Sequence, residues 1–338
     1  MNKKRILSIS VSFVALLLLI IDGKTASAGA TDGIALCTEV IIPSLFPFFL
    51  ITSYLNVQLA GIRMPGISRL GKYLHFPAGG EYILLLGLIG GYPVGAKMVA
   101  DAFKRNELDK RTGTILLGYC NNAGPAFIFG IAGALFTNLY APICLWVIHM
   151  ISAILTGLLL PHPAPQTMHM TKITPITLPK ALQQSISVCA SVCGWVIVFK
   201  VILAYMNAYL ASLLSNNSLI VISGIFELSN GCIRLSEFKS LPIRFILCSG
   251  YLAFGGLCVA LQTLSITGAL KWGLYLPGKL MQTCVSICLS LLSVQILYPD
   301  YHIPAKISLS VTGISLCIGA AAKYIAEKSC GNSKCIHV

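Results

Sequence analysis

Charged residues are scarce in this sequence. They make up 10% of the 338 residues, whereas hydrophobic residues make up 56% and the mean hydropathy is +0.82. Soluble domains average about a quarter charged residues, so a soluble globular fold is excluded. Apolar runs of roughly 20 residues, the length that crosses a bilayer as a helix, recur along nearly the whole chain. The composition therefore predicts an all-α polytopic membrane protein with no separate soluble domain.

Acidic residues are the rarer charge: 11 Asp and Glu stand against 24 Lys and Arg, a net charge of +13. Such an excess suggests nucleic-acid binding when it forms one patch. Here the basic residues lie in short clusters between apolar runs, a pattern that orients helices by the positive-inside rule. We therefore expect the lipid bilayer and no nucleic acid as a partner, and a multi-pass protein of the cell membrane with both termini cytoplasmic.

Signatures of catalysis and of metal binding are also missing. The sequence shows no nucleophile, base and acid constellation, no GxxxxGK[ST] phosphate loop and no metal-ligand spacing. Most of the 13 cysteines lie inside apolar runs, where cysteine behaves as a small hydrophobe. We expect no enzymatic activity, no cofactor and no metal site.

Apolar runs and basic clusters divide the chain into segments. Residues 1–28 are a membrane anchor, and cleavage as a signal peptide after Ala26-Ser27-Ala28 stays open. Two gate-like repeats, 29–160 and 181–297, are joined by a cytoplasmic linker, 161–180, and 298–338 hold the last transmembrane helix and a cytoplasmic tail. About eight full spans are expected, near 6–21, 34–55, 114–136, 139–160, 185–205, 248–263, 281–297 and 307–322.

The stretch GLIGGYPVGAK, residues 87–97, places four glycines and a proline in the middle of an apolar run. The loops before and after this run are both basic, and the positive-inside rule favours both on one side of the membrane. Each arm of 82–103 has about ten residues, or about 15 Å of helix, half a bilayer. The pattern predicts a re-entrant hairpin with Gly90 to Pro93 as its tip; one kinked span stays open as the alternative.

The next run is interrupted by CNNAGPAF, residues 120–127. Pro125 removes a backbone donor, and Asn121 and Asn122 are costly in lipid unless they face a partner or a cavity. The pattern predicts an unwound stretch at mid-membrane. The two asparagines then either contact a ligand or satisfy the free carbonyls of the broken helix.

The second half repeats this order weakly. SGIFELSNGCIRLSEF, residues 223–238, interrupts a short apolar segment, and Gly255-Gly256 interrupts the next span. A broken segment, a charged linker and a broken span thus recur at a near-constant offset, which predicts an inverted repeat with a second re-entrant hairpin; a full span stays open. Interrupted segments in corresponding positions indicate a transporter-like site at the bilayer midplane.

Glu227 is the only acidic residue that we place at membrane depth, where a charge costs roughly 2.5–3.5 kcal/mol on insertion scales. It is either a coupling-ion ligand or proton carrier, or a residue at the hairpin mouth paired with Arg234. The half-helix N-termini at 93–97 and 229–233 are expected to offer N–H groups to an anion or polar solute. Lys97 and Asp101 should form a surface ion pair, and Lys200 should snorkel.

The motif GLIGGYPVGAK, preceded by PSLFPFFL and followed by CNNAGPAFIFG, resembles membrane proteins with the gate, or nucleoside-recognition, domain. Within that group the chain resembles the YlbJ-type sporulation integral membrane proteins over about 33–292. More distantly, it is similar to the concentrative nucleoside transporters, whose hairpin tips and broken helices hold nucleoside and a coupling cation. The resemblance implies a role in sporulation, although the first tip lacks the Gln and Glu of a nucleoside site.

Together, these features predict a sporulation-associated transporter or gated pathway for a small polar or anionic, nucleoside-like solute, working by alternating access. A non-transporting scaffold for spore-envelope assembly is the alternative. Sodium or a proton is the candidate coupling cation, and a homo-oligomer stays open. The predicted binding residues share a place at a hairpin tip or a helix break: Gly90, Gly91, Tyr92, Pro93, Gly95, Asn121, Asn122, Gly124, Glu227, Ser229, Asn230, Gly255 and Gly256.

Overall fold

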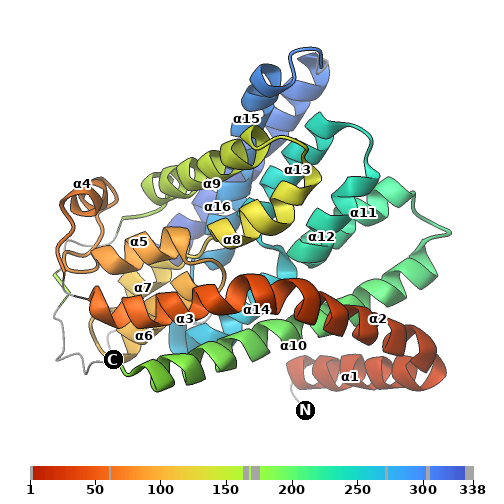
Figure 1. Ribbon diagram of the computed structural model, residues 1–338, viewed down its shortest axis with the longest axis horizontal. Coiled ribbons are helices and arrows are strands. Elements are labelled where there is room, and N and C mark those ends of the chain that lie inside the picture. Colours follow the sequence, from red (N-terminus) through yellow and green to blue (C-terminus); the bar gives the residue numbers. More distant parts are fainter. Residues whose placement is uncertain are drawn as a thin grey trace.

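The protein is described by a computed structural model over residues 3–60, 62–162, 167–168, 176–270, 273–301 and 305–331 (Figure 1). Within these ranges the chain is helical and contains no β-strand. The all-α polytopic prediction is confirmed. Parts of the predicted linker 161–180, and residues 332–338 of the predicted tail, lie outside the described residues.

Within the described residues, six helical segments are long and apolar enough to cross a membrane, fewer than the predicted eight spans. The two predicted spans without a counterpart among these six are the first run and the run at 114–136. The first forms α1 (Lys3–Ile21), of which only Arg5–Ile21 counts as an apolar helix, and the second is broken. The six are Gly23–Gln58, Tyr140–Leu159, Leu178–Leu210, Leu241–Leu270, Tyr275–Leu297 and Ser308–Ser329.

The first of these segments consists of α2 (Gly23–Leu36), a π-helical turn (Cys37–Ile41) and α3 (Ile42–Gln58). It begins well before the predicted start at Ile34, because the Asp22 side chain accepts a hydrogen bond from the Thr25 amide (3.2 Å) and caps the helix. Gly29 and Gly33 face α10 (Leu178–Leu210) so closely that a Cβ on either would lie 2.8 Å from the nearest atom of α10. Small residues four apart permit such close helix packing.

Figure 1 shows α3 and α10 side by side along one edge of the molecule. The far side is a group of four helices in which α15 (Tyr275–Leu297) packs against the other three: α9 (Tyr140–Leu159), α13 (Leu241–Phe254) and α16 (Ala305–Gly331). Two pairs of short helices lie between these groups in this view. Their ends lie next to the helix breaks described below.

The first pair is α5 (Glu81–Ile89) and α6 (Val94–Lys104), which pack against each other around the tip Gly90 to Pro93. At 1.5 Å per residue the two helices are about 14 Å and 17 Å long, roughly half a bilayer each. The second pair is α11 (Asn216–Phe226) and α12 (Leu228–Arg234), with Glu227 alone between them. Both are helical hairpins and neither is one kinked helix, although the second begins earlier than the predicted Ser223.

Two spans are broken where the sequence predicts it. After α7 (Lys110–Leu116) the chain has no helix at 121–124 and resumes with α8 (Pro125–Phe127), a π-helical turn (Ile128–Ala132) and a 3-10 turn (Gly133–Leu135). Between α13 and α14 (Gly256–Thr267), Gly255 and Gly256 have φ angles of +80° and +79°. Glycine adopts this region without steric cost, and other residues rarely do.

The hairpin topology of α5 and α6 can be tested by labelling. Lys72 and Asn106 are exposed and flank the hairpin, so Lys72→Cys and Asn106→Cys are expected to react with a membrane-impermeant maleimide from the same face of oriented vesicles. The parent should lack its exposed native cysteines. Labelling from opposite faces would show that 82–103 crosses the membrane.

Candidate functional site

The two hairpin tips and the two helix breaks meet inside the molecule. In the first hairpin, Gly91 lies against Gly124 of the first break, and the Tyr92 hydroxyl donates to the carbonyl of Leu252 (3.1 Å), just before the second break. In the second hairpin, the Leu228 amide lies against Gly256: its nitrogen is 3.3 Å from the position that a Cβ on Gly256 would occupy. Segments more than 130 residues apart in sequence are thereby brought to one place, roughly the arrangement that the interrupted repeat predicts.

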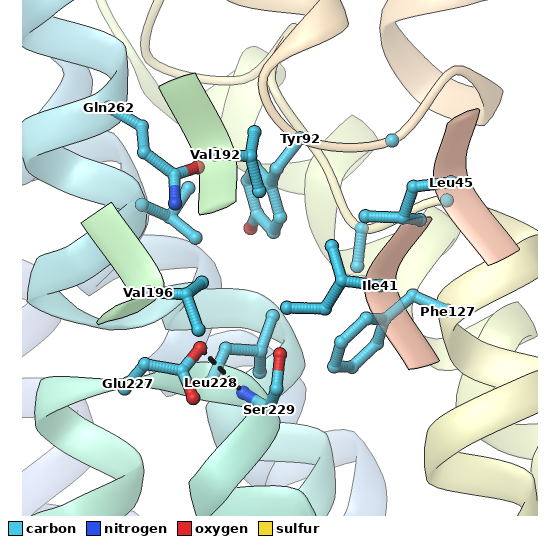
Figure 2. Close-up of a pocket in the computed structure, with 14 residues that line it drawn as sticks. Ile41, Leu45, Tyr92, Phe127, Val192, Val196, Glu227, Leu228, Ser229 and Gln262 are labelled. Carbon is cyan, nitrogen blue, oxygen red and sulfur yellow. Dashed lines mark hydrogen bonds between the residues drawn. The ribbon is translucent and has the colours of Figure 1, made fainter. Parts of the chain in front are cut away.

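A cavity of about 40 Å³ lies at this junction (Figure 2). Its polar lining comes from both hairpins and from α14: Tyr92, Glu227, Ser229 and Gln262. Its apolar lining includes residues from the α2–α3 segment, α8, α10, the second tip and α14: Ile41, Leu45, Phe127, Val192, Val196, Leu228 and Val259. The predicted residues Gly91 and Gly124 also line it, whereas Asn121, Asn122 and Asn230 do not.

The cavity volume restricts what this conformation can hold. One water needs roughly 10–15 Å³ of such space, so about 40 Å³ admits a few waters or a small ion. Sites for drug-sized ligands usually measure about 300–1,000 Å³. A nucleoside therefore does not fit between the tips unless the hairpins move apart.

Glu227 is 2% exposed and caps the helix that follows it. Its Oε1 accepts from the Ser229 amide (3.0 Å) and its Oε2 from the Asn230 amide (2.6 Å). A carboxylate at a helix N-terminus satisfies free N–H groups and is favoured by the helix dipole. Two of the N–H groups at 229–233 that were expected to bind a solute are thus already hydrogen-bonded to Glu227.

The predicted pairing of Glu227 with Arg234 is wrong. Arg234 Nε donates instead to Glu237 Oε1 at 2.9 Å, three residues further along the chain. Glu227 lies at the tip of the hairpin and Arg234 at the far end of α12, so the helix length separates them. This leaves the coupling-ion or proton-carrier role of Glu227 as a prediction.

Two lysines were assigned roles from their positions along helices. Lys97 and Asp101 form the predicted ion pair, with side chains 24% and 26% exposed. Lys200 does not snorkel: its Nζ donates to Asn230 Oδ1 (2.9 Å) on the second hairpin. The hairpin packs within reach of the middle of α10 and offers this lysine a partner inside the protein.

Asn121 and Asn122 are fully buried at the first break. Asn121 Nδ2 donates to Thr263 Oγ1 (3.0 Å) and its Oδ1 accepts from the Ala96 amide (3.3 Å). Asn122 Nδ2 donates to the carbonyls of Gly87 (3.1 Å) and Tyr119 (2.8 Å). Both side chains therefore hold the hairpin against the unwound stretch, which is the structural alternative that the sequence left open.

Lys279 is the main site residue that the sequence analysis missed. Its side chain is 0% exposed inside α15. Its Nζ donates to Gln282 Oε1 (2.6 Å), the Tyr92 hydroxyl (3.1 Å) and Asn122 Oδ1 (3.4 Å), and lies 5.1 Å from the centre of the Tyr92 ring. Tyr92 thus contacts both the buried amine of Lys279 and the cavity.

The network continues beyond Lys279. Gln282 Nε2 donates to Asn122 Oδ1 (3.0 Å), and His149 Nε2 accepts from the Ala123 amide (3.0 Å) of the first break. His149 Nδ1 is buried and has no hydrogen-bond partner among the described residues. Polar residues inside apolar runs were the available signal: His149 lies mid-span, and Gln282 lies beside Lys279 at the start of a span.

Acidic residues also occur inside the first candidate span. Glu39 lies in the π-helical turn inside the first candidate span, and its side chain is exposed on the outside of the structure. Among the described residues, no group of three or more His, Cys, Asp or Glu side chains is placed to hold a metal ion.

Comparison with curated proteins finds one sequence that is similar to this chain. The sporulation integral membrane protein YlbJ of Bacillus subtilis (strain 168) is 29% identical over 164 residues, which are 47% of this chain and 40% of YlbJ. The similarity supports a YlbJ-type assignment. No family model matches the chain. No solved structure matches it.

The chain therefore matches less than half the length of YlbJ. Together with the helices described above, this similarity makes the chain a multi-pass helical membrane protein with a sporulation protein as a homologue. The name of YlbJ mentions neither a gate domain nor nucleosides, so both stay predictions.

Proposed function

We propose that this chain is a sporulation-associated transporter, or gated pathway, for a small polar or anionic solute. The observation that carries the proposal is the meeting of two hairpin tips and two helix breaks at one small cavity. Unwound backbone at membrane depth is tolerated only where it is buried in protein or lines a cavity. In this proposal the chain is a carrier and has no catalytic reaction.

The structure corresponds to a closed state in this proposal. Movement of either hairpin away from its break would widen the cavity towards one face, which is alternating access. Tyr92 would act as the contact that opens, because it touches both the carbonyl of Leu252 and the ammonium of Lys279. Once Tyr92 moves, Lys279 would present a positive charge to an anionic solute.

Glu227 is the residue through which a coupling sodium ion or proton would act in this proposal. Its two oxygens each accept one backbone hydrogen bond, and each carboxylate oxygen has a second lone pair. Lys200, held on the neighbouring Asn230, supplies a nearby balancing charge. A homo-oligomer is compatible with the exposed apolar surface of α1, and we propose no specific interface.

A scaffold without transport is the second candidate, and specific observations favour it. The cavity measures only about 40 Å³, and Asn121 and Asn122 make internal hydrogen bonds. A gate-like fold that binds nothing would look the same in one closed state. Under this alternative the chain supports spore-envelope assembly through its surface.

Uptake measurements separate the two candidates. Purified chain in proteoliposomes would be offered labelled phosphate, glutamate and uridine, and the variants Glu227→Gln and Asn121→Ala compared with wild type. The amide introduced by Glu227→Gln would keep an oxygen that can cap α12, so the fold should survive, while initial uptake of the transported solute should fall at least about tenfold if a charged contact is lost.

Spore yield provides a second readout that needs no known solute. In a spore-former lacking its own copy of this chain, the two variants should fail to restore normal spores, whereas Asp300→Asn, a change at an exposed carboxylate, should restore them. Normal spore yield with both site variants, at wild-type protein levels, would support the scaffold.

A further inference from the structure

A second cavity lies outside the hairpin junction, between α4 (Pro65–Tyr73) and the start of α5. It measures about 270 Å³ and is lined by basic, acidic and apolar side chains: Arg63, Ile67, Ser68, Lys72, Phe76 and Glu81. Figure 1 shows α4 at one end of the molecule, beside α5. Nothing in the proposed transport function uses this cavity.

The acidic group of the cavity is incompletely satisfied. Glu81 is 7% exposed, and its Oε1 accepts from the Ser68 hydroxyl at 2.7 Å. Its Oε2 is buried and has no hydrogen-bond partner within the described part of the chain. A buried carboxylate oxygen without a donor is costly, and a ligand ammonium would supply the missing donors.

The basic groups of the cavity lie on its exposed side. Arg63 and Lys72 are exposed, and neither side chain makes a hydrogen bond or ion pair with any described residue. Both are therefore free to bind an anion such as a phosphate. A ligand that fits this cavity carries an amine at its inner end and a phosphate at the rim.

The position of α4 indicates where such a ligand comes from. Ile67 and Leu70 pack against the hydrophobic core, whereas Arg69 and Lys72 on the same short helix are exposed. Arg63 and α4 follow directly on the candidate span that ends at Gln58, and basic residues next to a span lie at the membrane surface. A ligand at the interface that carries an amine linked to a phosphate is the headgroup of an aminophospholipid.

We propose that the cavity between α4 and α5 binds the headgroup of phosphatidylethanolamine, with its ammonium at Glu81 and its phosphate at Arg63 and Lys72. This proposal is independent of the proposed transport function. Phosphatidylcholine has no N–H to donate to Glu81, and phosphatidylglycerol has no cation. The cavity therefore distinguishes the three lipids by charge and by hydrogen bonding.

Native mass spectrometry of the full chain in detergent tests this site, with one lipid added at a time. Phosphatidylethanolamine adducts should exceed those of phosphatidylcholine and phosphatidylglycerol by roughly tenfold, the effect of one charged hydrogen bond. Glu81→Gln should remove this preference. The double change Arg63→Ala and Lys72→Ala should weaken both phosphatidylethanolamine and phosphatidylglycerol. The control variants Asp300→Asn and Lys104→Ala, both at exposed sites away from the cavity, should change nothing.

Several outcomes would overturn the proposal. Equal adducts of the three lipids on the wild-type chain would do so, as would a preference that survives Glu81→Gln. If free phosphoethanolamine binds as tightly as the lipid, the site belongs to a soluble solute and the lipid assignment is wrong. Should Glu81→Gln fail to fold, the variant at the two exposed basic residues still decides, because undiminished phosphatidylethanolamine binding there contradicts the phosphate contact.

Discussion

Lys279→Met is expected to leave the chain folded and to abolish most of its transport. The ammonium of Lys279 binds the Tyr92 hydroxyl and the side chains of Asn122 and Gln282, and thereby joins α15 to the first hairpin tip and the first break. A hydrogen bond to a charged group contributes about 1.5–3 kcal/mol, so initial uptake should fall at least about tenfold.

The fold should tolerate this change. A charge inside a membrane span costs roughly 2.5–3.5 kcal/mol on insertion scales, and methionine is apolar and of similar length. The lost hydrogen bonds, about 1.5–3 kcal/mol each, offset this relief, so the melting midpoint of Lys279→Met should stay close to that of the wild type.

Measurement of both properties on one preparation makes this test decisive between the two proposed functions. Differential scanning fluorimetry gives the melting midpoint, and proteoliposome uptake or spore yield gives activity. Lys239→Met, at an exposed lysine, is the matched control and should change neither. A stable Lys279→Met variant with normal spore yield would favour the scaffold; a variant that no longer folds would show that Lys279 acts in assembly of the fold.

Much of the fold follows from features that a sequence displays locally. Hydropathy and loop charge predict the spans, and the glycines and Pro93 predict the first tip. The ends of spans are harder to predict from sequence, because capping residues decide them. With Asp22 as its cap, α2 begins eleven residues before the predicted Ile34. The run 114–136 is broken at the predicted place, and its remaining helices are too short to count as a span.

The candidate site was also predicted only where local sequence features mark it. The interrupted repeat names Gly91, Gly124 and Glu227, and these residues do line one cavity. Lys279 was missed because a charged residue next to an apolar run reads as part of a loop. Its burial depends on α15 packing against α9 and α13, and nothing local in the sequence reports those contacts.

The structure also changes the interpretation of Gly95, predicted as a binding residue. A Cβ at this position would overlap the carbonyl oxygen of Cys120 and lie 3.0 Å from the Cα of Asn121. Gly87, on the other helix of the hairpin, meets the same carbonyl at 2.5 Å. The hairpin therefore straddles the backbone of the first break, and glycine is needed for this close approach.

Gly95→Ala is accordingly expected to destabilise the fold more than any other glycine-to-alanine substitution in the first hairpin. The added carbon meets backbone, which cannot rotate away, so α6 must shift away from the break or the chain must fail to assemble. Overpacking usually costs 1–3 kcal/mol, and we expect about 3 kcal/mol or more here. Folded yield after size-exclusion chromatography and the melting midpoint measure this loss.

Gly194→Ala provides the matched control. Gly194 lies in α10 with nothing within 4 Å of its would-be Cβ, so alanine should stabilise the helix by about 0.5–1 kcal/mol. The two substitutions add the same methyl group to a helical glycine and should change the melting midpoint in opposite directions. If Gly95→Ala instead folds with the midpoint of the wild type, α6 does not pack on the Cys120 carbonyl, and the joint between hairpin and break on which the transport proposal depends is absent.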